Sequence, residues 1–277
     1  GFEARLQVSP IKIKNGLRWD LFGTYTRNKN EVLSLPNGVD QVVIGGFNGM
    51  SIVAAVGKPM GTFYAVDLAK DPQGRQIIDT LNGNPLSTTT PTYFGSFQPK
   101  FIASWGTNLK YKGFFFNVLF DTKQGGYFYS RTKDILEFVG VAASTTVNNR
   151  ESYIWENSVV QNAAGDYVPN TSYATNPYFY YTTANVKPSS QDLVKAGYIK
   201  LREVALGLNM PQKWFKGTFI GSGTLSLYGN NLAIWTNRGN DYVDPEVNSG
   251  GASNEQGFDF SARPSVKNYG FKVGLTF

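Results

Sequence analysis

Tyr269-Gly-Phe-Lys-Val-Gly-Leu-Thr-Phe277 ends the sequence with strict alternation of large apolar and small or polar residues. A period of two is typical of a β-strand whose two faces meet different surroundings. The side chains on one face are Tyr269, Phe271, Val273, Leu275 and Phe277. A face this apolar is stable only when it is buried, so it must pack against a second sheet or against lipid.

Six other segments alternate in the same way: 1–13, 17–27, 99–111, 114–122, 197–209 and 217–229. Asn15-Gly16 and Lys112-Gly113 are turn signals that join the first four into two hairpins. The apolar phase slips between Arg202 and Val204, which predicts a β-bulge. With 268–277 added, the sequence predicts an all-β, antiparallel fold of about seven strands.

The connections between these strands alternate in length. The short ones are 14–16, 112–113 and 210–216, and the long ones are 28–98, 123–196 and 230–267. Long loops are uncommon in compact domains, whereas transmembrane β-barrels have short periplasmic turns and long extracellular loops. We therefore expect an antiparallel transmembrane β-barrel segment, with short helices at 133–140 and 190–197 inside the loops.

Alternation also assigns side chains to faces. The residues expected to face the lumen are Arg5, Arg18, Asp20, Lys100, Lys110, Lys200 and Arg202. We expect these charges to pair with one another more readily than to contact a transported molecule. The membrane girdle and terminal strand are expected to present Trp19, Trp105, Tyr269, Phe271 and Phe277 to lipid.

The composition argues against several classes of protein. The 277 residues include no His and no Cys, which removes the usual metal ligands, imidazole bases and thiolate nucleophiles. No carboxylate pair stands out as a glycosidase site, so we expect no catalytic residues and no cofactor. The net charge is +6, but its cations are scattered, which argues against a nucleic-acid partner. No apolar run reaches the length of a membrane-spanning helix.

Two groups of loop residues are candidate binding sites. The aromatic group is Tyr173, Tyr178, Phe179, Tyr180 and Tyr181, which could stack on a substrate, contact a partner protein or pack the loop itself. The acidic group, Asp241, Asp244 and Glu246, could offer oxygens to Ca²⁺. Its spacing differs from that of an EF-hand loop, which favours hydrogen bonding within the loop.

Several motifs occur in a fixed order along the chain. They are Val56-Gly-Lys-Pro-Met-Gly-Thr-Phe-Tyr64, Gly125-Gly126-Tyr127 with Arg131, Tyr198-Ile-Lys-Leu-Arg-Glu-Val-Ala-Leu-Gly-Leu-Asn-Met-Pro211, Leu225-Ser-Leu-Tyr-Gly-Asn-Asn-Leu-Ala-Ile-Trp235, Asp244-Pro-Glu-Val247 and the terminal Phe277. The ordered set resembles the C-terminal barrel region of the SusC/RagA family of TonB-linked outer-membrane transporters of Bacteroidetes-type bacteria. The terminal strand also resembles the signal that the outer-membrane insertion machinery reads, but Lys272 stands where that signal usually has Gly.

The resemblance implies a 22-stranded barrel in the outer membrane of a Gram-negative bacterium, with residues 1–277 as its C-terminal part. The partners it implies are the N-terminal plug and earlier strands, which this chain lacks, a SusD-like lipoprotein, the TonB complex and outer-membrane lipid. It implies import of oligosaccharides or peptides. Gly1 to Val8 already alternates like mid-sheet sequence rather than like a signal peptide, so we expect the chain to be the later part of a longer protein.

Two alternatives remain open at this point. The same barrel could serve as a structural scaffold in an outer-membrane assembly, with loops that bind proteins instead of nutrients. The chain could also be a secreted β-sandwich that binds glycan, in which case the apolar face of the terminal strand would pack on a second sheet.

Overall fold

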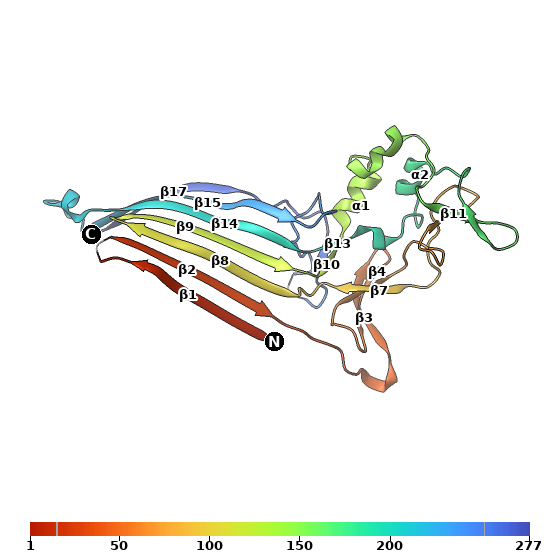
Figure 1. Cartoon of the computed structure of the whole chain (residues 1–277), viewed down its shortest axis with the longest axis horizontal. Helices are drawn as coiled ribbons and strands as arrows, with labels where there is room; N and C mark the ends of the chain where they lie inside the picture. Colours follow the sequence, from red (N-terminus) through yellow and green to blue (C-terminus); the bar gives the residue numbers. More distant parts are fainter. Residues whose placement is uncertain (15, 252) are drawn as a thin grey trace.

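Seven long strands form one antiparallel sheet (Figure 1), in a computed structural model that describes residues 1–14, 16–251 and 253–277. The strands in spatial order are β1 (Phe2–Lys12), β2 (Leu17–Arg27), β8 (Phe101–Tyr111), β9 (Phe114–Gln124), β14 (Tyr198–Met210), β15 (Ser222–Thr236) and β17 (Asn268–Thr276). Each strand pairs with its neighbours along the chain, as the alternation predicts. Asn15 of the predicted first turn lies outside the described residues.

The sixth strand is displaced from its predicted position at 217–229. β15 begins at Ser222, which pairs with Thr276 at the end of β17. It continues to Thr236, which pairs with Tyr198 at the start of β14. The predicted bulge is confirmed, since the register of β14 shifts between Leu201 and Glu203 against both neighbouring strands.

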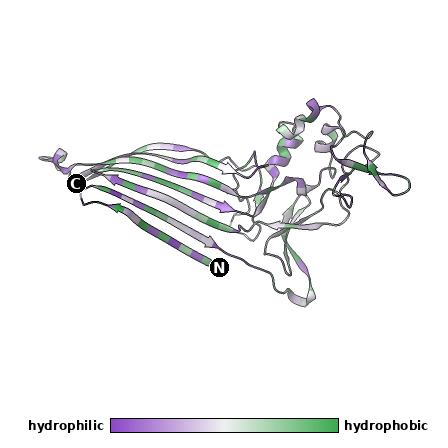
Figure 2. Ribbon diagram, viewed as in Figure 1, coloured by the Kyte–Doolittle hydropathy of each residue, from purple (hydrophilic) through white to green (hydrophobic). Residues whose placement is uncertain are grey.

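The two faces of the sheet differ in chemistry, as the banding along the strands in Figure 2 shows. One row across the apolar face consists of Trp19, Leu109, Phe116, Leu206, Leu227 and Phe271. A row across the polar face consists of Arg5, Thr24, Ser104, Asp121 and Lys200. The side chains of Leu227 and Phe271 are 61% and 72% exposed, so no second sheet among the described residues covers this face. The alternative of a β-sandwich is therefore not supported by the described residues.

Aromatic rings on the polar face lie over glycines of the neighbouring strand. Phe115 pairs with Gly207, where a Cβ atom would lie 2.2 Å from the ring. Phe22 pairs with Gly106, where a Cβ would lie 2.5 Å from the ring. Only glycine leaves room for such an approach. These pairs hold the large rings against the sheet, so that the rings do not project from its polar face.

The long connections fold into a layer of small elements at one end of the sheet (Figure 1). Its sheets are β3 (Gln41–Phe47), β4 (Met50–Ala55), β5 (Thr62–Ala65) and β7 (Thr92–Ser96); β13 (Leu193–Lys195), β10 (Tyr127–Ser130) and β16 (Phe258–Asp259); and β12 (Tyr167–Pro169), β11 (Ser158–Gln161) and β6 (Gln76–Ile77). Its helices are α1 (Arg131–Phe138) and α2 (Pro177–Thr182), with the 3-10 turns η1 (Pro36–Gly38), η2 (Ala143–Arg150) and η3 (Ser189–Asp192). At the opposite end, η4 (Gln212–Phe215) lies in the turn between β14 and β15.

This loop layer has a hydrophobic core of its own. The fully buried side chains that pack together are Met50, Ile52, Ala65, Phe63, Tyr129 and Phe258. They come from three of the long connections, and Phe63 and Phe258 meet edge to face at 6.0 Å. The loops therefore share one hydrophobic core and do not fold independently.

One of the two predicted loop helices is confirmed. α1 begins after Ser130, whose hydroxyl accepts a hydrogen bond from the Lys133 amide as an N-cap. The predicted helix at 190–197 is wrong. Only the η3 turn is helical there, because Leu193–Lys195 pairs as a strand with Tyr127–Tyr129. In the described part of the chain, no helix has both the length and the apolar character needed to cross a membrane.

Candidate functional site

Five charged residues join the polar face of the sheet to the connection between β15 and β16. We call Asp121, Lys200, Arg202, Asp244 and Glu246 the wall cluster. Lys200 Nζ lies 2.6 Å from Asp244 Oδ2 and also contacts Glu246. Arg202 Nε lies 2.8 Å from Asp121 Oδ1, and its guanidinium also binds Glu246. The loop carboxylates are thus tied to two cations of one strand.

The β14 bulge decides which side chains can enter the wall cluster. Lys200 lies in the polar row with Asp121, and Arg202 also reaches Asp121 from that side. Without the extra residue at the bulge, Val204 would share the face of these two cations, since period-two alternation would continue. The bulge instead places Val204 opposite Val118 on the apolar face.

Asp244 and Glu246, which were weak candidates for calcium ligands, bind cations of this chain instead. Both carboxylates are bound to the Lys200 ammonium, and Glu246 also binds the Arg202 guanidinium. Across the described ranges 1–14, 16–251 and 253–277, no group of three or more His, Cys, Asp or Glu side chains could hold a metal ion. The third candidate, Asp241, is therefore not part of such a group either. The sequence pattern could not show this, because the neutralising cations lie more than 40 residues away.

We expect the wall cluster to weaken in acid. Burial raises the pKa of Glu246, but hydrogen bonds from Arg202, Lys200 and Tyr198 outweigh it and hold the pKa at about 2, against an ordinary value of 4.5. Because the folded-state pKa is the lower one, the contribution of Glu246 is fully present above pH 4.5 and is lost as the pH falls toward 2. Hydrogen exchange at residues 240–248, corrected for intrinsic rates, should show protection decreasing across that range. A Glu246→Gln variant should lack this step; an identical step in both proteins would contradict the assignment.

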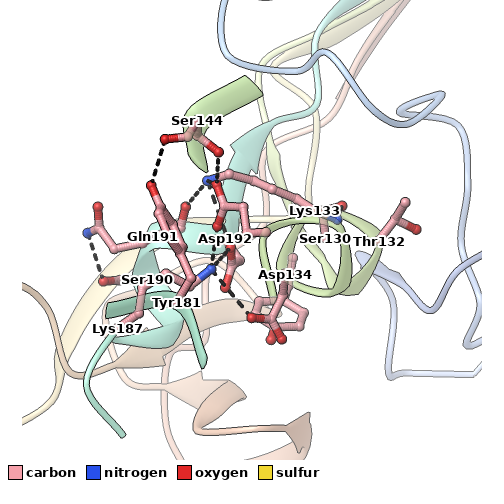
Figure 3. Close-up of polar contacts among 12 residues, drawn as sticks. Ser130, Thr132, Lys133, Asp134, Ser144, Tyr181, Lys187, Ser190, Gln191 and Asp192 are labelled. Atoms are coloured by element: carbon pink, nitrogen blue, oxygen red, sulfur yellow. Dashed lines mark hydrogen bonds and ion pairs between the residues drawn. The ribbon is translucent and has the colours of Figure 1, made fainter. Parts of the chain in front are cut away.

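A second charged group holds the helical part of the loop layer together (Figure 3). We call Lys133, Asp134, Glu137, Lys187 and Asp192 the loop cluster. Lys187 Nζ lies 2.6 Å from Glu137 Oε2, 2.7 Å from Asp192 Oδ1 and 3.4 Å from Asp134 Oδ1. Lys133 adds weaker contacts of 3.8 Å to Glu137 and Asp192. The cluster therefore connects α1 to the segment that enters β13.

The loop cluster is buried, so its charges depend on one another. The side chains of Lys187, Glu137 and Asp192 are only 7%, 4% and 1% exposed. Burial lowers the pKa of Lys187, but the carboxylates of Asp192 and Glu137 outweigh it and raise the pKa overall. Burial raises the pKa of Asp192 overall, although its 2.7 Å contact with the Lys187 ammonium acts in the opposite direction. We infer an ionic cluster at neutral pH.

A polar cavity of about 390 Å³ lies beside the loop cluster. Asn48, Arg131, Lys187 and Ser189 contribute to its lining. The Ser189 hydroxyl is buried and has no hydrogen-bond partner among the described residues. Donors and acceptors of this kind suit a ligand rich in hydroxyl or amide groups, such as a sugar or a peptide. The cavity is therefore a candidate ligand site in the loop layer.

The predicted aromatic group is divided by the structure. Tyr180 is 3% exposed and packs on Trp155 at 5.3 Å, so the prediction of a ligand contact is wrong for this residue. α2 is only six residues long, and Tyr180 occupies its inward side. Tyr181 lines the polar cavity and donates a hydrogen bond to the Ser144 carbonyl. The remaining three, Tyr173, Tyr178 and Phe179, are 38%, 67% and 56% exposed.

Most of the charges expected to face the lumen share the polar face of the sheet. Arg18 pairs with Lys110 in register, and its guanidinium lies 2.8 Å from Asp20 on the same strand. Lys100 is an exception, because it precedes β8 and lines a cavity with Tyr25 and Phe101 at the loop end of the sheet. Its assignment to the lumen is therefore wrong.

The aromatic residues expected at the membrane lie on the apolar face, but not all at strand ends. Trp19, near the turn end of β2, donates a hydrogen bond to the Thr107 hydroxyl. Trp105 sits in the middle of β8 opposite Gly23 and stacks on Phe120 at 5.6 Å, which contradicts a girdle position. Tyr269 is 73% exposed near the loop end of β17, and Phe277, stacked on Phe219 at 5.4 Å, lies at the turn end.

Neither the loop cluster nor the polar cavity was predicted from the sequence. Lys187 lies 50 residues from Glu137, and neither belongs to a motif that names a ligand. The available signal was the capping pattern of α1, which places Asp134 and Glu137 about one turn apart on the same helix. No sequence feature near these two carboxylates identifies Lys187 as the cation that they contact.

Two TonB-dependent receptors are similar in sequence to nearly the whole chain. TonB-dependent receptor P3 of Formosa agariphila is 22% identical over 289 residues, covering 94% of this chain and 27% of the relative. TonB-dependent receptor P26 of the same bacterium is 25% identical over 311 residues, covering 100% and 29%. The chain spans less than a third of the length of these curated relatives. No family model matches it.

Solved structures show the same architecture. The RagAB peptide transporter superposes with a TM-score of 0.68 at 16% identity, over 99% of this chain and 29% of that one. The RagAB peptide importer in its open-open state gives a TM-score of 0.69 at 16% identity, over 99% and 28%. The seven-stranded sheet and its loop layer thus have the fold of a barrel segment in those proteins.

Proposed function

We propose that this chain, a member of the SusC/RagA family of TonB-dependent receptors, is the C-terminal wall and extracellular loop layer of an outer-membrane nutrient importer. The observation that carries the proposal is the two-faced sheet, with short turns at one end and a folded loop layer at the other. Such a sheet is stable when lipid covers its apolar face and a water-filled lumen meets its polar face.

In the complete transporter, earlier strands would close the sheet into a barrel of 22 strands, and an N-terminal plug would occupy it. Both edges of this sheet, β1 and β17, have unpaired backbone groups on one side among the described residues, and these groups need partners inside a bilayer. Energy would come from TonB through the plug. The substrate would be an oligosaccharide or a peptide that contacts the polar cavity.

Import can be tested in the bacterium that carries the gene. Deleting the gene for the complete transporter should abolish TonB-dependent uptake of at least one labelled oligosaccharide or peptide, and the intact gene should restore it. Uptake that is unchanged by the deletion, with loss of a protein assembly instead, would favour the scaffold alternative.

A small apolar patch formed by the C-terminal end of α1 and by α2 suits a partner protein. We call Phe138, Val139, Tyr178 and Phe179 the loop-tip patch; their side chains are between 55% and 67% exposed. Phe138, Val139 and Tyr178 line one shallow cavity, and Tyr178 meets Phe179 edge to face at 5.6 Å. Exposed aromatic pairs often anchor protein interfaces. We propose that a SusD-like lipoprotein binds here.

The Tyr178→Ala/Phe179→Ala double variant should bind the lipoprotein at least tenfold more weakly, because truncating an aromatic anchor typically costs about 2 kcal/mol or more. The measurement is affinity between the purified transporter variants and the lipoprotein. Leu81→Ala is the matched control, since Leu81 is a 92% exposed apolar residue elsewhere in the loop layer. Equal affinities for all three proteins would place the interface elsewhere.

A further inference from the structure

A cavity of about 480 Å³ lies at the loop end of the sheet, where β2 ends and β8 begins. Two aromatic rings in its lining, Tyr25 and Phe101, stack with centroids 5.3 Å apart. Phe2 of the neighbouring strand extends the row, with its ring 6.2 Å from that of Tyr25. Two adjacent strands thus give the cavity an aromatic side, and a third strand continues the row of rings beyond it.

The aromatic side of this cavity belongs to the apolar face of the sheet. Tyr25 pairs with Ala103 and Ala4, and it follows Trp19 and Leu21 at even spacing along β2. Side chains at even spacing on a strand share a face. The rings are thus the last large apolar side chains of that face before the chain enters the loop layer.

Three cations line the same cavity beyond the rings. Arg27, Lys29 and Lys100 are all exposed. None of them forms a side-chain hydrogen bond or an ion pair with another described residue, although the wall cluster and the loop cluster show that cations in this chain commonly do. Among the described residues that line the cavity, none carries a carboxylate. The site has positive charge without a counterion.

We propose that this cavity binds the phosphorylated headgroup of a lipid in the outer leaflet, with its acyl chains along the apolar face below. The inference rests on the proposed orientation of the barrel, in which the loop layer is extracellular. A lipid fits better than a soluble anion, because the rings place apolar surface next to the cations, as an amphiphile requires. Lys and Arg near a membrane surface attract anionic headgroups in this way.

The test uses the complete transporter in nonionic detergent, titrated with diphosphoryl lipid A and observed by native mass spectrometry. The Arg27→Ala/Lys29→Ala/Lys100→Ala variant should bind lipid A about a hundredfold more weakly, because the loss of each cation should reduce the affinity about fivefold. Lys14→Ala/Lys213→Ala/Lys216→Ala is the matched control, because these three cations lie in turns at the opposite end of the sheet. The control should bind like the unmodified protein.

Several outcomes would overturn the proposal. Equally weakened lipid binding by both triple variants would show that the cations act only through net charge, and binding of both like the unmodified protein would show that the cations take no part. Full displacement by inorganic phosphate at the same concentration would identify a simple anion site. Equal binding of lipid A from which the phosphates have been removed would show that the rings alone recognise the lipid. In each case nutrient uptake by the triple variant should remain normal, so failure here is distinguishable from failure of the import function.

Discussion

A Lys187→Met variant should lose the attachment of α1 to the segment that enters β13. Removing the ammonium leaves the carboxylates of Glu137 and Asp192 buried without their principal partner. Breaking a buried ion pair in this way typically costs about 3–5 kcal/mol. Hydrogen exchange of the complete transporter should show the free energy of local opening decreasing by that amount in residues 131–138 and 189–195.

Lys195→Met provides the matched control for this prediction, because Lys195 is exposed in the same segment. It should leave exchange within about 0.5 kcal/mol of the unmodified protein. Adding Glu137→Gln and Asp192→Asn to Lys187→Met should recover part of the loss, since the two most deeply buried groups of the cluster are then neutral. Unchanged exchange in the single variant would mean that the loop cluster does not stabilise the loop layer.

A Lys200→Met variant should release the β15–β16 connection from the wall. Lys200 is 3% exposed, and its ammonium contacts both Asp244 and Glu246. The expected cost is again about 3–5 kcal/mol, because two partly or fully buried carboxylates lose a cation. Limited proteolysis of the complete transporter should cut within residues 237–250 much faster than in the unmodified protein.

Lys110→Met is the appropriate control for Lys200→Met. Lys110 lies on the same polar face but is exposed near the turn end of β8. Its replacement should leave proteolysis of the connection unchanged. Equal cleavage rates for Lys200→Met and the unmodified protein would show that other contacts hold the connection to the wall.

The strands could be predicted from sequence because each signals itself locally. Leu225, Leu227 and their neighbours alternate over enough residues to identify a strand and its two faces without knowledge of the partner strand. The bulge in β14 was visible for the same reason, as a phase slip between Arg202 and Val204. The ends of β15 were not visible, since they depend on where Thr276 and Tyr198 lie.

The loop layer could not be predicted in this way, because its order comes from contacts between distant segments. Leu193–Lys195 has helix-like flanks but pairs with Tyr127–Tyr129, 66 residues earlier. The cations that neutralise Asp244 and Glu246 are likewise in another element. Tyr180 could not be separated from its exposed neighbours, because a single helical turn decides which of them points inward.

In the proposed barrel wall, the apolar face of the sheet meets lipid and the polar face meets water. The chain has no cysteine, so nitroxide labels on single introduced cysteines report single positions within it. Labels at Leu109 and Leu227 test the apolar face, and labels at Asn108 and Ser226 test the polar face. In the complete transporter in lipid vesicles, the first pair should collide with oxygen and be shielded from a water-soluble nickel complex, and the second pair should show the reverse. Equal accessibility of all four positions to both reagents would show that the sheet does not separate lipid from water.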